Sequence, residues 1–387
     1  MRRLLTCQLC ASLMFSAGCG SDTSGSELVA ISRSSHSVCA TGSDDWKPHA
    51  NARVEALDGW DASPTLGLAS TDADIFAFDG ALTRVARFGL TGDLRGHIGR
   101  EGDGPGEFRP PRSGGSLILP RGATTDWLAV QDDTVVAFDG RRLQAMTAGG
   151  DYIADLAEPA WLGTGGAPRF SSRLRVRSDT VFLDIESQVL SSASKDRGTR
   201  SFNVWQVVKG RPPLSIASVV LQRLPTIGNG GPYLGPREAT PLWDIQNGCI
   251  VISDGGHPHL LLVHSTQREL DTLAIELPTR EVSLGPDETS ALLRKLGQEK
   301  PPAPGLPRRV RRMIVSPDGW VWIEPIQPAG LADVEVIRVN LGTGLQRTDT
   351  VPFFPSAFGA PGEMFSIVRS RSGGYAVRRT LLRVGSG

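Results

Sequence analysis

Short apolar runs recur along this chain in groups, and each run is bounded by polar, glycine or proline residues that favour turns. Runs of this length suit β-strands rather than helices, and paired runs joined by short turns suit antiparallel neighbours. The groups form about six units of roughly 40–60 residues, which is typical of a repeat architecture with four strands in each unit. The runs cover residues 74–79 and 82–88, 126–130 and 134–138, 180–184 and 202–208, 249–252 and 260–263, 320–323 and 334–339, and 365–368, 373–377 and 380–384.

The pattern therefore predicts an all-β, six-bladed β-propeller with four-stranded blades. The composition agrees, because 45 glycines and 27 prolines supply turns while 40% hydrophobic residues suffice for a large core. One inserted helix is expected near residues 286–297, where Pro286 and acidic residues open a leucine-lined segment that Gly297 can end. A ring of blades has to close, so an N-terminal strand is expected to complete the last blade; residues 52–57 or 28–32 are the candidates.

The first residues have the features of an export signal. Arg2 and Arg3 precede an apolar run over residues 4–15, which is too short to span a bilayer, and small residues at 16–18 precede Cys19. This ending is similar to the lipobox of bacterial lipoproteins, although Ser16 stands where leucine is usual. Residues 1–19 are thus interpreted as a signal with Cys19 as the lipidation site, residues 20–45 as a flexible tether, and residues 46–387 as the propeller. Cleavage as an ordinary signal peptide is the alternative.

Only two of the five cysteines, Cys39 and Cys249, lie outside the targeting segment. In an exported protein they can form a disulfide that staples the N-terminal segment onto a distant strand. The alternative, left open by the sequence, is that Cys249 is a buried thiol in its apolar run.

A glycine-rich loop at residues 99–108 contains Pro-Gly-Glu followed by Phe108, and residues 361–365 repeat Pro-Gly-Glu with Met364 before the aromatic. Residues 166–170 repeat the pattern more faintly. Glycine permits positive φ and proline pre-sets a turn, so each copy is expected to deliver the chain into a new strand. The motif residues of the first copy are Gly104, Pro105, Gly106, Glu107 and Phe108.

With this loop, and with a strand that ends in Asp79 before a turn, the chain resembles bacterial six-bladed β-propeller lipoproteins related to the NHL-repeat propellers. The resemblance covers most of the mature chain, but only the loop is specific. It implies a lipoprotein that faces the periplasm or the cell surface. Most members of this group have no known activity, so the resemblance names no reaction.

Related propellers include enzymes that hold a divalent cation in the central channel, so carboxylates at strand ends are candidate ligands. None of their spacings singles out a set, and turn capping is the alternative role. The candidates are Asp79, Asp184, Glu186, Asp254, Asp318 and Glu324. Asp244 is interpreted as a turn residue rather than a channel carboxylate.

His257 and His259 are a weak candidate pair for zinc or copper, because alternate residues of a strand face the same side. With Pro258 between them, the favoured interpretation is that both are loop residues. Five tryptophans in strand-like runs are expected to fill space between blades: Trp127, Trp205, Trp243, Trp320 and Trp322.

The charge balance, 41 basic against 41 acidic residues, argues against a nucleic-acid partner. The short basic run at residues 308–312 is interpreted as a solvated linker that enters a strand. No convergent set of titratable groups emerges, so the sequence favours an envelope-bound scaffold for a protein or saccharide partner, anchored to a membrane through lipid, with no required cofactor. The alternative is a metal-dependent hydrolase or lyase of the gluconolactonase-like type, which would use a divalent cation.

Overall fold

The computed structural model describes the strands of the ring and some of the turns between them. The described residues are 39, 46–47, 54–56, 65–79, 83–109, 126–139, 142–157, 173–177, 179–190, 197–227, 231–232, 241–265, 270–278, 309–327, 333–359, 362–369 and 375–384. The proposed signal at residues 1–19 and the expected helix at residues 286–297 lie outside this part. The described residues contain no helix, and therefore no helix that is long and apolar enough to cross a membrane.

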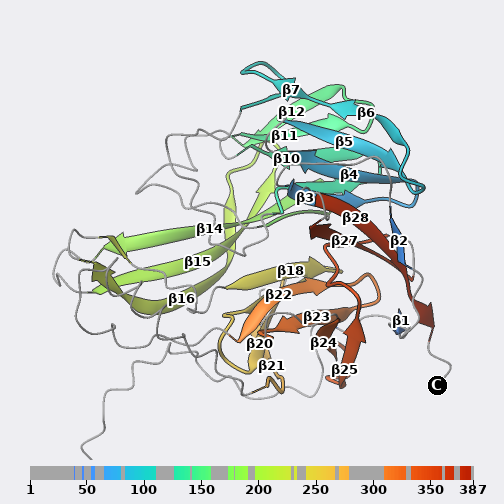
Figure 1. The fold of residues 1–387 in the computed structure, drawn as a ribbon. Coiled ribbons are helices and arrows are strands. Elements are labelled where there is room, and N and C mark those ends of the chain that lie inside the picture. Colours follow the sequence, from blue (N-terminus) through green and yellow to red (C-terminus); the bar gives the residue numbers. More distant parts are fainter. Residues whose placement is uncertain are drawn as a thin grey trace, which may run out of the picture.

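Six antiparallel sheets stand around a central axis as the blades of a propeller (Figure 1). The first strand of each sheet is the innermost one, and the following strands lie progressively further out. Blade 1 is β3 (Thr65–Ser70), β4 (Asp74–Asp79), β5 (Arg84–Gly89) and β6 (Leu94–Ile98), and blade 2 is β9 (Leu128–Gln131), β10 (Thr134–Phe138), β11 (Leu143–Thr147) and β12 (Tyr152–Ala157). Blade 3 is β13 (Leu174–Arg177), β14 (Thr180–Leu190), β15 (Arg197–Val208), β16 (Leu214–Ile227) and β17 (Gly231–Pro232).

The second half of the ring repeats this order. Blade 4 is β18 (Leu242–Gln246), β19 (Cys249–Ser253), β20 (His259–His264) and β21 (Leu270–Ala274), and blade 5 is β22 (Val310–Val315), β23 (Trp320–Pro325), β24 (Val334–Asn340) and β25 (Gln346–Val351). Blade 6 is β26 (Ala357–Phe358), β27 (Glu363–Arg369), β28 (Tyr375–Leu381) and β2 (Val54–Ala56).

The ring closes through the N-terminal strand β2, which pairs with β28 and supplies the outermost strand of blade 6, with Val54 opposite Thr380. A shorter pair follows the same route, because β1 (Trp46–Lys47) pairs with β29 (Arg383–Val384). The prediction that residues 52–57 complete the last blade is thus confirmed. Both ends of the chain are held in one blade, which removes an open sheet edge.

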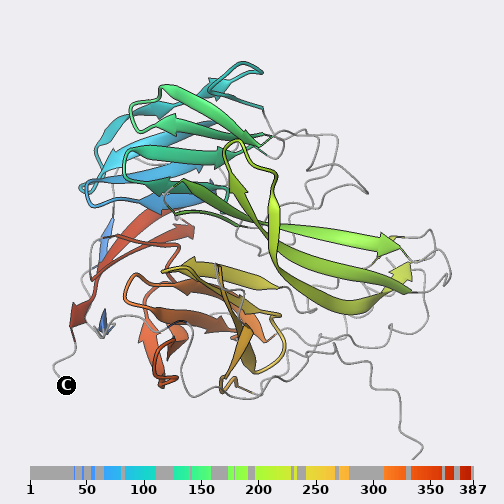
Figure 2. The same cartoon turned by 180° about the vertical axis from the view of Figure 1, so that it is seen from behind.

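Blade 3 departs from the four-stranded plan. Its strands β14, β15 and β16 are 11, 12 and 14 residues long, and β17 adds a fifth strand. The far ends of the three long strands project well beyond the ring as a separate arm, seen from both sides in Figures 1 and 2. We call residues 185–190, 197–203 and 218–227 the blade 3 arm.

The core lies between neighbouring blades. Phe108 packs against Phe78 with ring centroids 5.0 Å apart, and Trp322 of blade 5 faces Phe358 of blade 6 at 5.5 Å. Trp127, Trp243, Trp320 and Trp322 are all buried, as predicted, whereas Trp205 is half-buried. Aromatic side chains fill the wedge-shaped space between twisted sheets because they bring the largest apolar area for each residue.

The hairpin between β18 and β19 shows how local sequence sets the strands. Asn247 and Gly248 both have positive φ, 49° and 76°, which is the conformation of a two-residue turn whose twist matches that of the strands. Gln246 and Cys249 face each other across this turn. An Asn-Gly pair between apolar runs is the strongest short-range signal for such a hairpin, and the expected turn is found here.

Candidate functional site

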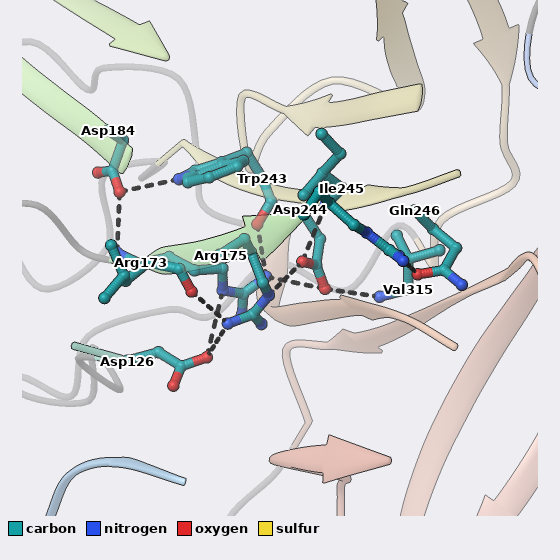
Figure 3. Close-up of polar contacts among 11 residues, drawn as sticks. Asp126, Arg173, Arg175, Asp184, Trp243, Asp244, Ile245, Gln246 and Val315 are labelled. Atoms are coloured by element: carbon teal, nitrogen blue, oxygen red, sulfur yellow. Dashed lines mark hydrogen bonds and ion pairs between the residues drawn. The ribbon is translucent and has the colours of Figure 1, made fainter. Parts of the chain in front are cut away.

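Four charged side chains meet among the innermost strands (Figure 3). Asp126 stands just before β9 and forms a bridge with Arg173, which stands just before β13. Arg175 lies in β13 of blade 3, and Asp244 lies in β18 of blade 4. Arg175 bridges the two acids, because its Nε lies 2.7 Å from Asp244 Oδ1 while its Nη1 contacts Asp126 Oδ2. Arg173 Nη1 lies 3.5 Å from Asp244 Oδ2. We call these four residues the inner ion cluster.

The inner ion cluster is buried, so its charges depend on one another. Burial alone would raise the pKa of Asp244, but the guanidinium groups of Arg175 and Arg173 outweigh it and hold that pKa below its ordinary value. Asp126 shows the opposite balance: burial raises its pKa despite both arginines, and its Oδ1 makes no hydrogen bond within the described residues. Two acids and two bases in one cluster leave no net charge to attract an ion.

Backbone groups complete the bonding of Asp244. Its Oδ1 accepts a hydrogen bond from the N–H of Ile245 at 2.9 Å, and its Oδ2 accepts one from the N–H of Val315 at 2.8 Å, on the innermost strand of blade 5. Asp244 therefore links blades 3, 4 and 5. The interpretation of Asp244 as a turn residue was wrong, because the residue lies in the middle of a strand and its side chain is turned inward.

A second buried acid, Asp184, joins the same region from β14. Its Oδ1 accepts hydrogen bonds from the indole Nε1–H of Trp243 and from the backbone N–H of Arg173, each at 2.8 Å. This contact fixes the first strand of blade 3 against blade 4 (Figure 3). Asp184 thus serves as a hydrogen-bond acceptor between blades 3 and 4.

The remaining strand-end carboxylates do not converge on the axis. Glu324 is buried between Arg311 and Arg312, with 3.1 Å from its Oε1 to Arg311 Nη1. Asp318 accepts a hydrogen bond from the Ser316 hydroxyl, in the turn before β23. Asp79 ends β4 and is buried, and the side chain of Glu186 lies outside the described part. Asp126 and Asp244 are paired with Arg175, and Asp184 accepts hydrogen bonds from two N–H groups, so these acids do not fit a channel cation of the gluconolactonase-like type.

The basic run at residues 308–312 was interpreted as a solvated linker that enters a strand, and the structure corrects this for Arg312, whose side chain is 19% exposed. Arg311 and Arg312 lie in strand β22 and neutralise Glu324, and the guanidinium of Arg312 stacks over Phe354 at 4.7 Å. A buried acid needs such partners, since an unpaired charge in the interior is costly.

The motif loop joins blade 1 to blade 2. Glu107 Oε2 accepts the N–H of Gly104 at 2.7 Å, so Glu107 closes the turn that Pro105 and Gly106 form. Gln144 of β11 binds both the N–H of Gly106, at 3.0 Å, and the carbonyl of Glu107, at 2.9 Å. Phe108 is fully buried. These contacts give the motif a structural role, which is to fasten a connection onto the next blade.

The second copy of the motif occupies a different place. Glu363 begins β27 and Gly362 stands in the turn just before it, so this copy lies inside blade 6 rather than in a connection between blades. Its carboxylate pairs with Arg379 of β28. The Pro-Gly-Glu sequence therefore recurs, but at a different position of the repeat. The copy at residues 166–170 lies outside the described part.

His257 and His259 belong to the loop between β19 and β20 and to the first position of β20. Their rings are stacked, with centroids 5.4 Å apart, and the Asp254 carboxylate contacts His257 Nδ1. One ligand atom from each of Asp254, His257 and His259 lies within 4.8 Å of the other two. Burial lowers the pKa of His259, which favours the neutral imidazole.

The two mature cysteines are joined. Cys39 and Cys249 form a disulfide with Cα atoms 5.4 Å apart, across 210 residues of sequence. Both are buried between blades 4 and 5, beside Val251 and Val321. Since Cys249 starts β19 and Asp254 follows its end, the disulfide and the histidine pair lie on opposite faces of the ring.

Sequence reasoning missed Asp126, Arg173 and Arg175. A signal was present, because Arg173, Arg175 and Arg177 alternate along one short strand and must face the same side. The signal was weak, since three arginines at alternate positions are also typical of a solvated edge. Only the arrangement of blades places Asp126 and Asp244 on either side of Arg175.

No protein-family model and no curated protein matches the chain. A solved member of the DUF4221 family from Bacteroides vulgatus is similar, with 10% identity and a TM-score of 0.52 over 90% of this chain and 100% of that one. Virginiamycin B lyase from Staphylococcus aureus shares 10% identity at a TM-score of 0.40, over 86% of this chain and 99% of that one. Regucalcin from Agrobacterium tumefaciens, a calcium-binding protein, shares 11% sequence identity at a TM-score of 0.42, over 86% of this chain and 95% of that one. At such an identity the first likeness shows the fold alone. The chain is an all-β, six-bladed propeller with four-stranded blades and a fifth strand in blade 3.

Proposed function

We propose that this chain is an exported, lipid-anchored propeller that serves as a binding scaffold in the cell envelope. The observation that carries the proposal is the blade 3 arm, which extends three paired strands beyond the ring (Figure 2). Ring closure needs only four short strands in each blade, so these extra lengths are not required for the fold. The edge of a projecting sheet offers backbone hydrogen-bonding groups to a partner.

The inner ion cluster supports a scaffold rather than a catalyst. Catalysis by acids and bases needs titratable groups that are free to exchange protons with a substrate. Asp244 is instead held by two arginines and two backbone N–H groups, and Asp126 by Arg175. Such contacts fix strands against each other and occupy the groups that a reaction would use.

Export is supported by two independent features. The signal-like segment ending at Cys19 comes from the sequence, and the disulfide between Cys39 and Cys249 comes from the structure. Disulfides persist outside the reducing cytosol, so the pair fits an envelope compartment. The anchor is tested by acyl labelling in bacterial cells of the full chain and of Cys19→Ser. Labelling that disappears in the variant is expected, and labelling that persists would refute Cys19 as the anchor.

The binding role is tested through the arm. A photo-crosslinking residue is placed at Ser187 or Ser201, which face each other in the arm, and at Thr134 of blade 2 as the control. Cells that express each full-length variant are irradiated, and purified peptidoglycan is probed separately for saccharide binding. The proposal expects one discrete adduct from the arm positions that the control lacks. Equal, diffuse adducts at all positions, together with no peptidoglycan binding, would refute it.

A further inference from the structure

Blades 1, 2, 4 and 5 each have a buried carboxylate at or near the end of the second strand, namely Asp79, Asp139, Asp254 and Glu324. Asp139 follows β10 in blade 2, and Glu324 lies near the end of β23 in blade 5. Asp139 has the guanidinium of Arg142 at 3.7 Å, and Glu324 lies between Arg311 and Arg312. A buried acid that remains ionised needs such a cation nearby, because leaving water is costly for an unpaired charge.

Asp254 is the corresponding acid of blade 4, and no arginine or lysine in the described part of the chain forms an ion pair with it. Its Oδ1 accepts the backbone N–H groups of Gly256, at 2.9 Å, and His257, at 2.8 Å, while its Oδ2 contacts His257 Nδ1. The side chain is only 6% exposed. The turn is therefore capped as in blade 2, but the countercharge is missing.

The strand register shows what replaces the arginine. In blade 2, Phe138 faces Leu143, and one step further along the ladder Asp139 reaches Arg142. In blade 4, Ile252 faces Leu261, and two steps further Asp254 reaches His259. His259 thus takes the register place of Arg142, and a turn longer by two residues adds His257 above the same carboxylate. Two imidazoles stand where one guanidinium neutralises the acid elsewhere.

The loop that carries these groups is held on both sides. Gly255 O accepts the N–H groups of Arg309, at 2.8 Å, and Val310, at 3.0 Å, from the start of blade 5, and Pro258 O accepts that of Ile275 at 3.0 Å. Gly255 has a φ of 83°, a conformation that glycine adopts without strain. The three donor side chains therefore sit on a fixed frame, which lowers the cost of holding an ion between them.

We propose that Asp254, His257 and His259 bind one divalent transition metal ion of the Zn²⁺ type. Two imidazole nitrogens and one carboxylate oxygen form a donor set that suits such ions, and the ion supplies the positive charge that Asp254 lacks. The donor atoms lie within 4.8 Å of one another, against about 3.3 Å expected between ligands of a tetrahedral zinc centre. Small side-chain rotations, with the ion replacing the contact between the Asp254 carboxylate and His257 Nδ1, bring them into range.

Three ligands leave at least one coordination position for an exchangeable ligand. The side chain of His257 is 29% exposed, so that position faces solvent rather than the core. Water or a carboxylate from a partner would fill it. The metal proposal does not depend on the scaffold function, because the proposed site lies in blade 4 whereas the scaffold proposal rests on the blade 3 arm.

The test uses the purified full-length chain after treatment with a chelator and dialysis. Zn²⁺ binding is measured by calorimetry and elemental analysis, and Co²⁺ is added as a probe whose visible absorption reports a nitrogen and oxygen site of low coordination number. One equivalent of Zn²⁺ is expected, together with a rise in melting temperature, since a ligand of the folded state stabilises it. Absence of both binding and the cobalt absorption at a hundred micromolar metal would overturn the proposal.

Matched variants locate the site. His257→Gln and His259→Gln should each weaken Zn²⁺ binding at least tenfold and abolish the cobalt absorption, and Asp254→Asn should weaken binding while the turn keeps its Oδ1 acceptor. His264→Gln, at the far end of the same strand, should bind as the wild-type chain does. Melting curves without metal check that each variant folds. If the double variant His257→Gln/His259→Gln folds and binds Zn²⁺ as tightly as wild type, the assignment is wrong.

Discussion

Arg175 Nε lies 2.7 Å from Asp244 Oδ1, and this contact joins the innermost strands of blades 3 and 4. The same carboxylate reaches Val315 of blade 5 through its other oxygen. One acid therefore holds three of the six blades in register around the axis, so its replacement should weaken the whole ring.

We expect Asp244→Asn to lower the free energy of unfolding by about 3 kcal/mol, because two buried arginines lose a charge partner. The amide keeps an oxygen acceptor of the same shape, so the loss reports the charge rather than a cavity. Chemical denaturation at neutral pH measures it. The exposed Asp72→Asn is the control and should change stability by less than about 0.5 kcal/mol. A loss at Asp244 no larger than that of the control would contradict the assigned role.

The ionisation of Asp244 should make the free energy of unfolding depend on pH. Its pKa is lowered in the folded state, so the ionised form contributes stability above the unfolded-state value of about 3.9 and loses it as pH falls through the folded value. The difference in unfolding free energy between wild type and Asp244→Asn should thus be full at pH 6–7 and shrink below pH 4. The pKa of Asp126 is raised, so its contribution to stability is present at low pH and is lost as pH rises, which makes the wild-type unfolding free energy depend less on pH. Urea titrations from pH 3 to 7 measure both curves, and parallel curves would speak against this account.

Two glycines at the edge of blade 1 offer a paired test of the motif loop. Gly99 has a φ of 75°, and a Cβ there would come within 2.3 Å of the Phe108 ring. Gly99→Ala should therefore cost about 2 kcal/mol or more through strain and displacement of Phe108. Gly96, in the neighbouring strand β6, has open space at its Cβ position, so Gly96→Ala should be nearly neutral. Thermal melting compares the two, and equal shifts would show that Phe108 is not held as described.

Removal of the disulfide should destabilise the chain by about 5 kcal/mol, because the bond closes a loop of more than 200 residues in the unfolded state. Cys39→Ser is the preferred change, since it leaves the apolar run of β19 unaltered. The free energy of unfolding of the wild type should fall by the same amount when a reductant is added, whereas that of the variant should not change with the reductant. A variant as stable as the oxidised wild type would mean that the bond adds nothing.

Local sequence predicted much of the fold because each strand can be recognised from a few neighbouring residues. The hairpin at Asn247 and Gly248 and the closing strand near Val54 are both signalled by neighbouring residues and were found where expected. The inner ion cluster depends instead on which blades stand side by side, a long-range property that no short window contains. Asp244 was therefore misplaced at a turn, and Asp126 was overlooked.

The histidine pair lies between these cases. The sequence identified His257 and His259 but favoured a plain loop, because two histidines around a proline are common in turns. What strengthens them is Asp254, whose burial and missing arginine become visible only when the blades are compared. The proposed signal, lipid anchor and helix fall outside the described residues and stay predictions.

The covalent bond at Cys39 also decides how the ring responds to tension. A pull from the N-terminal side meets Cys39 before it meets β1 and β2, so the force enters the second strand of blade 4 through the disulfide. The seam of the propeller, held by strands of only two and three residues, is then shielded from peeling. Reduction of the bond would shift the same pull onto that seam, where hydrogen bonds break one after another. A chain tethered by its N-terminus would thus open from blade 6 only after its disulfide is lost.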